Sequence, residues 1–116
     1  MAVEIRPALA LKLLHEFSFA LVTDDEPDLS ARQLAVLLTI YLEPPPHTVR
    51  GLAAKLGVTK PVITRALDTM GKLGLVDRRR DEADRRNVVI QRTVKGALAV
   101  ERLGDLLAAK AKKLPR

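Results

Sequence analysis

Residues 48–67 constrain the fold most, because two short helical patterns are separated there by a single glycine. Thr48 is suited to cap the first helix, and Gly57 can adopt the left-handed backbone conformation that ends it. Thr59 can cap the second helix, and Pro61 falls in its first turn, where a missing amide proton is tolerated. The segment therefore predicts a helix-turn-helix, in which two helices meet at a steep angle.

Apolar residues in the same segment are spaced to lock the two helices together. They are Leu52, Leu56, Val58, Ile63 and Ala66. Ala53 is small enough for the helices to approach closely. A helical hairpin that never meets DNA could carry the same caps, so the motif alone leaves the function open.

Length and composition limit the kind of protein. A chain of 116 residues holds one core, and its few aromatic residues favour packed helices built from aliphatic side chains. The absence of cysteine excludes disulfides, thiol redox sensing and cysteine-bound zinc. Charged residues interrupt the apolar N-terminal segment, which indicates neither a signal peptide nor a membrane span. We expect a cytoplasmic protein that does not bind membranes.

Positive charge is concentrated in one part of the chain. Residues 50–95 contain twelve Lys and Arg against five Asp and Glu, a net of +7, whereas the whole chain has a net charge of +6. A basic surface attracts phosphate backbones, although basic runs alone are often only solvated. Because this basic segment includes most of the predicted helix-turn-helix, DNA is the favoured partner.

The N-terminal segment, from about residue 4 to 22, is apolar around most of a helical axis. Such a helix needs cover on a second side, most simply from another subunit, so we expect a homodimer. Residues 24–28 should break this helix. Ser30 and Gln33 form a capping box for a second helix that ends near Leu42. Its expected buried face consists of Leu34, Leu37, Leu38 and Tyr41.

Three prolines at 44–46 should hold the next connection extended. After the helix-turn-helix, Gly74 should end the fourth helix, and residues 75–80 and 87–93 have the pattern of two strands joined by a charged turn. Thr93 can cap a last helix. The predicted fold is mainly α with a small β-hairpin wing, in the order α-α-α-α-β-β-α. We expect residues 1–116 to form a single winged-helix domain, with 3–23 and 93–114 as flanking dimerisation helices.

The fourth helix has one apolar and one polar face. Thr64 and Arg65 lie on the polar face, where Arg65 could read guanine and Thr64 could bond a base or touch a thymine methyl. Thr59 and Lys60 at the start of this helix favour phosphate contact. Asp68 could orient Arg65, accept from a cytosine amine, or form a simple salt bridge with Arg65.

The charged turn at residues 81–86 mixes its signs, unlike a simple electrostatic tail. Asp84 lies two residues before Arg86 and is suited to hold its guanidinium in an extended pose. An extended arginine at a wing tip could enter a narrow minor groove. A solvated hairpin with internal ion pairs is the alternative.

Residues 71–96, with the sequence GKLGLVDRRRDEADRRNVVIQRTVKG, resemble the end of the recognition helix, the wing and the start of the next helix in the MarR family of bacterial transcription regulators. The similarity spans roughly residues 30–103, in a short variant with one helix after the wing. It implies a homodimeric winged helix on a pseudo-palindromic operator, with Arg86 in the minor groove, Asp84 supporting it and residues 59–65 in the major groove. The predicted DNA-binding residues are Thr48, Thr59, Lys60, Pro61, Thr64, Arg65, Asp84, Arg85 and Arg86.

The sequence favours two other classes of function less than DNA binding. A winged-helix adaptor could bind an acidic protein through the same surface, but an apolar recognition face would then be more usual. An enzyme is disfavoured, because His15 and His47 are far apart and no metal-ligand, phosphate-loop or nucleophile pattern is present. No cofactor is expected. The partners are double-stranded DNA and a second copy of the chain, and the sequence names no small-molecule effector, although an apolar one could lie between the first helix and the core.

Overall fold

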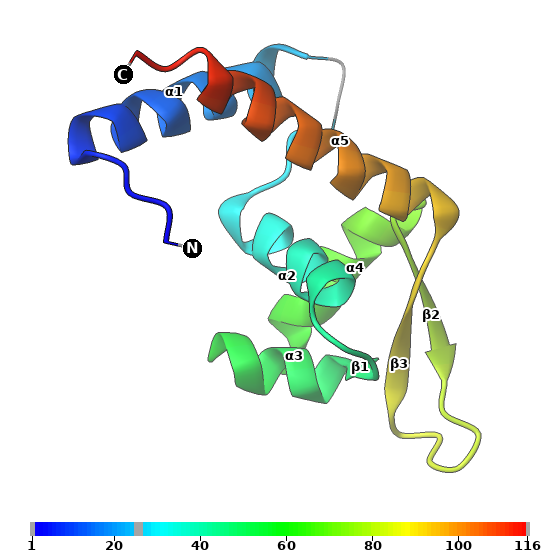
Figure 1. Ribbon diagram of the computed structural model, residues 1–116. Helices are drawn as coiled ribbons and strands as arrows, with labels where there is room; N and C mark the ends of the chain where they lie inside the picture. Colours follow the sequence, from blue (N-terminus) through cyan, green and yellow to red (C-terminus); the bar gives the residue numbers. More distant parts are fainter. Residues whose placement is uncertain (1, 25–26, 116) are drawn as a thin grey trace. The chain divides into compact units, whose positions relative to one another are not determined.

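The computed structural model describes residues 2–24 and 27–115 (Figure 1). In chain order the elements are α1 (Pro7–Thr23), α2 (Ala31–Leu42), β1 (His47–Thr48), α3 (Val49–Leu56), α4 (Lys60–Lys72), β2 (Val76–Arg80), β3 (Val88–Arg92) and α5 (Val94–Lys112). The predicted winged-helix fold is confirmed, with one strand more than the sequence indicated.

The chain forms two compact units, one of residues 29–100 and one that joins the segment up to residue 28 with the segment from 101 onwards. Helix α5 begins in the first of these units and ends in the second. The winged helix lies entirely within residues 29–100. The prediction of a single domain with flanking dimerisation helices is not decided by this division and stays a prediction.

Most predicted helix caps are present. The Ser30 hydroxyl accepts a hydrogen bond from the Gln33 amide, and the Gln33 side chain accepts one from the Ser30 amide, which completes the capping box. Thr48 Oγ1 accepts from the Gly51 amide at 2.9 Å, and Gly57 ends α3 with a left-handed φ of 68°. A side chain at Gly57 would be strained in that conformation.

Thr93 also caps as predicted, because its Oγ1 accepts from the Gly96 amide at 2.9 Å. Thr59 differs: it is the N-cap residue of α4 by position, but its side chain makes no capping hydrogen bond. Pro61 has no amide proton to offer, and the Val62 amide donates to the Thr59 carbonyl oxygen instead. The start of α4 is therefore set by backbone geometry.

The predicted buried face of α2 was partly wrong. Leu37 is buried and Tyr41 packs at the edge of the core, but Leu34 and Leu38 are only half-buried. Val36 and Ile40 are fully buried in their place. Because apolar residues occupy almost every position of this helix, hydropathy did not determine which side faces the core.

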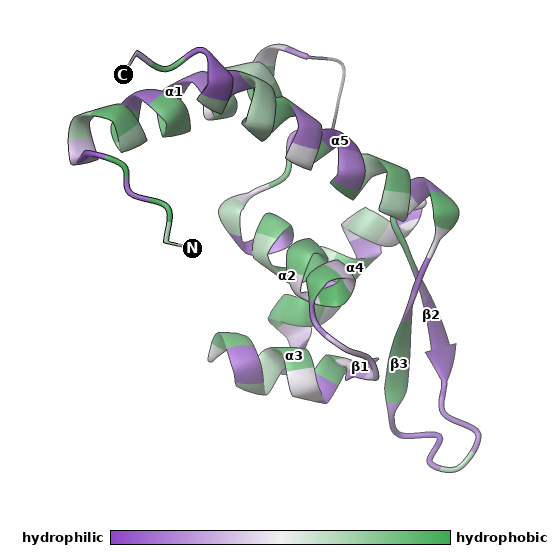
Figure 2. Ribbon diagram, viewed as in Figure 1, coloured by the Kyte–Doolittle hydropathy of each residue, from purple (hydrophilic) through white to green (hydrophobic). Residues whose placement is uncertain are grey.

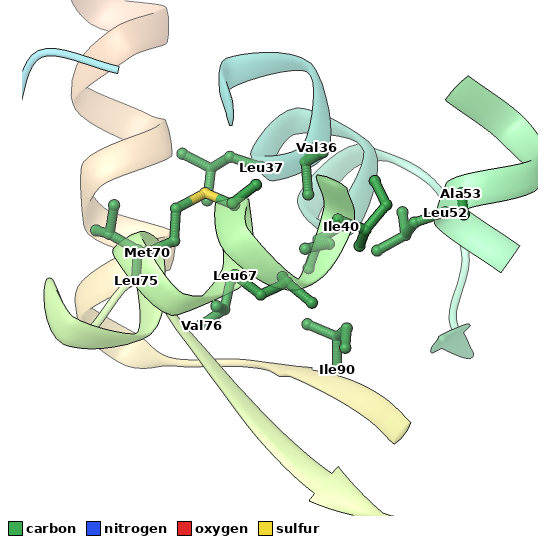
Figure 3. Close-up of a cluster of buried hydrophobic side chains, with 12 residues drawn as sticks. Val36, Leu37, Ile40, Leu52, Ala53, Leu67, Met70, Leu75, Val76 and Ile90 are labelled. Carbon is green, nitrogen blue, oxygen red and sulfur yellow. The ribbon is translucent and has the colours of Figure 1, made fainter. Parts of the chain in front are cut away.

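The core lies where α2, α3 and α4 meet the sheet (Figure 3). Val36, Ile40, Ile63, Leu67 and Met70 are completely buried. Burying a side chain of this size contributes about 1.5–3 kcal/mol. This packing fixes the orientation of α4, whose opposite face is left exposed.

The sheet has three antiparallel strands in the order β1-β3-β2. The hairpin β2–β3 was predicted, whereas β1 was not: His47 pairs with Ile90 and Thr48 with Val89. Two residues are too short to show an alternating pattern, so a strand of this kind leaves no periodic signal in the sequence. It ties the start of α3 directly to the wing.

Helix α1 begins at Pro7, later than the predicted residue 3 or 4, since proline favours the first helical turn. Of the predicted helix break at residues 24–28, Asp25 and Glu26 lie outside the described residues. In the part of the chain that is described, no helix has the length and hydropathy required to cross a membrane.

Candidate nucleic-acid interface

The polar face of α4 points to solvent. Pro61, Thr64, Arg65 and Asp68 are exposed, as are Thr59 and Lys60 at the start of the helix. The opposite face carries the buried core residues of α4. The helix thus presents the predicted surface, although the contacts assigned to it remain predictions.

Asp68 does not pair with Arg65, and both roles that linked these residues were wrong. Asp68 Oδ1 lies 2.8 Å from Arg78 Nη1 of β2. The Arg78 side chain passes near Gly71, where a Cβ would lie 3.9 Å from Arg78 Nη2, an ordinary van der Waals contact. The side chain of Arg65 has no hydrogen bond or ion pair among the contacts described, so its guanidinium is available to a partner.

The wing tip has the predicted arrangement. Asp84 Oδ1 accepts a hydrogen bond from the Arg86 amide at 3.1 Å and lies 3.4 Å from Arg86 Nε. The Arg86 side chain nevertheless remains 89% exposed. Asp84 therefore restrains the arginine without covering it, and Arg85 beside it is exposed too.

Other polar contacts stiffen the wing loop, and sequence reasoning missed them. Asp81 Oδ1 accepts from the Ala83 amide at 2.9 Å, and its other oxygen lies 3.5 Å from Asn87 Nδ2. Arg80 Nη1 donates to the Arg85 carbonyl oxygen at 2.7 Å. An aspartate bonded to an amide two residues later is a local turn signal that could have been found.

Several basic residues of segment 50–95 serve the fold. Arg92 Nε donates to the Ile40 carbonyl oxygen and Arg92 Nη2 to the Glu43 carbonyl oxygen, each at 2.8 Å. These bonds satisfy the C-terminal end of α2, where a cation is favoured. Lys55 forms an ion pair with Glu43. The charge excess therefore overstates the number of cations free to meet phosphate.

Thr48 differs from the other predicted DNA-binding residues, which are all exposed. It is half-buried, belongs to β1, and its hydroxyl is occupied in capping α3. Its predicted DNA contact stays a prediction that the local geometry does not favour.

His15 is exposed on α1, whereas His47 is in a packing position. His47 is buried with Nε2 3.1 Å from the Glu43 carbonyl oxygen, and His15 makes an edge contact with Phe19. Within residues 2–24 and 27–115, no group of three or more potential ligands is placed to hold a metal ion.

The helix-turn-helix of α3 and α4, with α4 exposed, is followed by the arginine-bearing hairpin of β2 and β3. This arrangement defines a winged-helix protein. The profile of the MarR family matches residues 28–87, half of the chain. No protein of curated function matches the sequence significantly. The chain belongs to the MarR family of winged-helix transcription regulators.

Solved structures agree with this assignment. The transcriptional regulator PcaV from Streptomyces coelicolor, in complex with its natural ligand, is 26% identical with a TM-score of 0.65, over 95% of this chain and 80% of PcaV. A mutant MarR from E. coli is 26% identical with a TM-score of 0.71, over 96% and 83% of the two chains. The transcriptional repressor CouR, bound to a 23-mer DNA duplex, is 26% identical with a TM-score of 0.71, over 90% and 71%.

Proposed function

We propose that this protein is a sequence-specific regulator of transcription that binds double-stranded DNA. The observation that carries the proposal is that two arginine side chains are exposed in the same compact unit: Arg65 on the exposed face of α4, and Arg86 at the wing, which Asp84 restrains but leaves 89% exposed. DNA binding by CouR supports it.

Each predicted residue except Thr48 has a role in this proposal. Arg65 reads guanine and Thr64 a neighbouring base in the major groove, next to Pro61 in the first turn of α4. Thr59 and Lys60 contact phosphate. At the wing, Arg86 enters the minor groove and Arg85 adds positive charge beside it.

We propose further that the protein is a cytoplasmic repressor that acts as a homodimer on a pseudo-palindromic operator. Symmetric dimers read half-sites about one turn of B-DNA apart, roughly 34 Å. The designation of CouR as a repressor supports this direction of regulation. A small-molecule effector is compatible with the ligand-bound state of PcaV, but the chain itself does not define the ligand.

The polar character of the exposed α4 face argues against the adaptor function, since a protein-binding face of this kind would carry apolar anchors. No observation favours an enzyme. DNA is therefore the partner to test first.

Genomic footprinting of the tagged protein would test sequence-specific binding and reveal the operator together. We expect enrichment of a short pseudo-palindrome near promoters. Uniform coverage, together with equal affinity of the purified protein for all duplexes, would refute sequence-specific regulation.

The same operator allows Arg65 to be tested. Arg65→Ala should weaken operator binding more than binding to random duplex, by about 1–3 kcal/mol of discrimination. Lys60→Ala is the matched control and should weaken both equally. Equal losses for Arg65→Ala would reassign this residue to phosphate contact.

A further inference from the structure

A hollow of about 230 Å³ lies between the first turn of α2 and one edge of α4. Its lining consists of Ser30, Arg32, Gln33, Val62, Arg65, Ala66 and Thr69. All of these belong to residues 29–100, so the hollow lies within one compact unit. Two of the lining residues are arginines and none is acidic, which gives it a net positive charge.

The polar groups of the hollow are mostly hydrogen-bond donors. Arg32 and Arg65 are exposed, and the guanidinium of neither has a hydrogen bond or ion pair among the contacts described. The Gln33 side-chain oxygen is already bonded to the Ser30 amide, which leaves the Gln33 NH₂ group free to donate. Ser30 Oγ accepts from the Gln33 amide and keeps its own proton for a further acceptor.

The hollow is also next to the surface that reads DNA in the proposed function. Arg65 lines it and at the same time belongs to the exposed face of α4. The start of α2 adds the positive end of a helix dipole, which strengthens attraction of an anion but does not define the site by itself. A duplex whose major groove received α4 would bring its backbone to the edges of this helix.

We propose that the hollow receives a phosphate of the DNA backbone, held by Arg32 and the side-chain NH₂ group of Gln33, while Arg65 extends from its rim toward the base edges. Arg32 is then a DNA-binding residue that sequence reasoning did not identify. The assignment rests on the proposed function. It also gives different roles to two exposed arginines: Arg32 positions the duplex, and Arg65 reads it.

Titration of Arg32→Gln with operator and with random duplex tests the assignment. A phosphate contact predicts roughly a threefold to tenfold loss on both duplexes, an unchanged ratio between them, and a fall of about one in the slope of log K against log salt. Lys112→Gln is the matched control, since it removes the same charge from the last turn of α5, and it should change affinity much less. Thermal unfolding of Arg32→Gln should match the parent, because the side chain is exposed.

Each contrary result has a distinct meaning. If the parent binds DNA and Arg32→Gln binds equally well, the phosphate assignment is wrong and the proposed function stands. A parent that binds no duplex would refute both. If millimolar inorganic phosphate raises the unfolding temperature of the parent but not of Arg32→Gln, while their DNA affinities are equal, the hollow takes free phosphate and the DNA assignment is overturned.

Discussion

At the scale of single residues, Gly96 has the least room for a side chain among the six glycines of the chain. A Cβ added there would overlap both the Tyr41 hydroxyl and the Leu75 carbonyl oxygen. These groups are bonded to each other at 2.6 Å, and Tyr41 Oη also accepts from the Thr93 amide at 3.0 Å. The contact joins the end of α2 to the start of α5 and admits only glycine.

Gly96→Ala should therefore destabilise the protein, although alanine is the better helix former by about 1 kcal/mol. The methyl group must displace Tyr41 or the backbone at Leu75, and overpacking together with a lost hydrogen bond gives a net loss of about 2–3 kcal/mol in the free energy of unfolding. Gly104→Ala is the control on the same helix, since a Cβ there meets nothing within 4 Å. Chemical denaturation measures both, and equal stability of the two variants would contradict this packing.

Asp84 permits a test whose sign decides between two mechanisms. Asp84→Ala removes a negative charge, so charge alone predicts tighter DNA binding. If Asp84 restrains Arg86, its removal should weaken operator binding about fivefold, on the order of 1 kcal/mol for a lost hydrogen bond. Titration at fixed salt measures the difference.

Glu82→Ala is the matched control at the same turn, because it removes the same charge from a side chain with no described contact. It should bind DNA as tightly as the parent or more tightly. Should Asp84→Ala follow Glu82→Ala, the wing is only a charged patch.

At the scale of elements, the ion pair of Asp68 and Arg78 joins α4 to β2. Their side chains are 50% and 35% exposed, so we expect the pair to add under about 1 kcal/mol to stability. Asp68→Asn should leave unfolding nearly unchanged and strengthen binding to random duplex, because it frees Arg78 and removes a carboxylate from the face that we propose meets phosphate.

Arg78→Gln is the reciprocal variant and should weaken binding to every duplex, since Asp68 is then left uncompensated. A double-mutant cycle on the unfolding free energy measures the coupling directly. Coupling well above 1 kcal/mol would show that the pair holds the wing in place, contrary to this expectation.

The number of residues between two contacting side chains decided whether their contact could be predicted from the sequence. Asp84 and Arg86 are two residues apart, so their contact was predicted from the sequence. Arg92 bonds a carbonyl 52 residues away, and Asp68 pairs across the gap between a helix and a strand. Such contacts depend on packing that no local pattern encodes.

The same distinction between local and long-range contacts applies to the helices and strands. Caps at Ser30 and Thr48, and the turn at Gly57, were predicted because each depends on a few adjacent residues. The two-residue strand β1 and the buried side of α2 depend on the position of β3 and α4 in space. Local chemistry thus defined the motif, and tertiary packing decided the rest.

At the scale of the whole molecule, hydrophobic residues recur along α1 (Figure 2). Several of their side chains are exposed and require cover. Leu11, Leu14, Phe19 and Val22 are between 59% and 67% exposed. Burying side chains of this size against a partner is worth about 1.5–3 kcal/mol each when complete. A second copy of the chain is the occupant that the proposed function requires, since two α4 helices must face one pseudo-palindrome.

We expect light scattering at micromolar concentration to give twice the 12.8 kDa mass of the chain. Leu14→Glu should give the monomer, because a carboxylate at an apolar interface would be desolvated without a partner. The monomer can hold only one half-site at a time, so loss of the second contact should weaken operator binding about a hundredfold or more. Unfolding of the winged helix should still be cooperative, since its core does not include α1.

Lys12→Glu provides the control for this variant, because it introduces a carboxylate on the same helix at a residue already paired with the charged Glu16. It should remain dimeric and bind the operator within a fewfold of the parent. A parent that stays monomeric with and without operator DNA would refute dimerisation. A Leu14→Glu variant that stays dimeric would instead place the interface away from this face of α1, and α5, whose Leu98 and Leu107 are also exposed, would be the next helix to test.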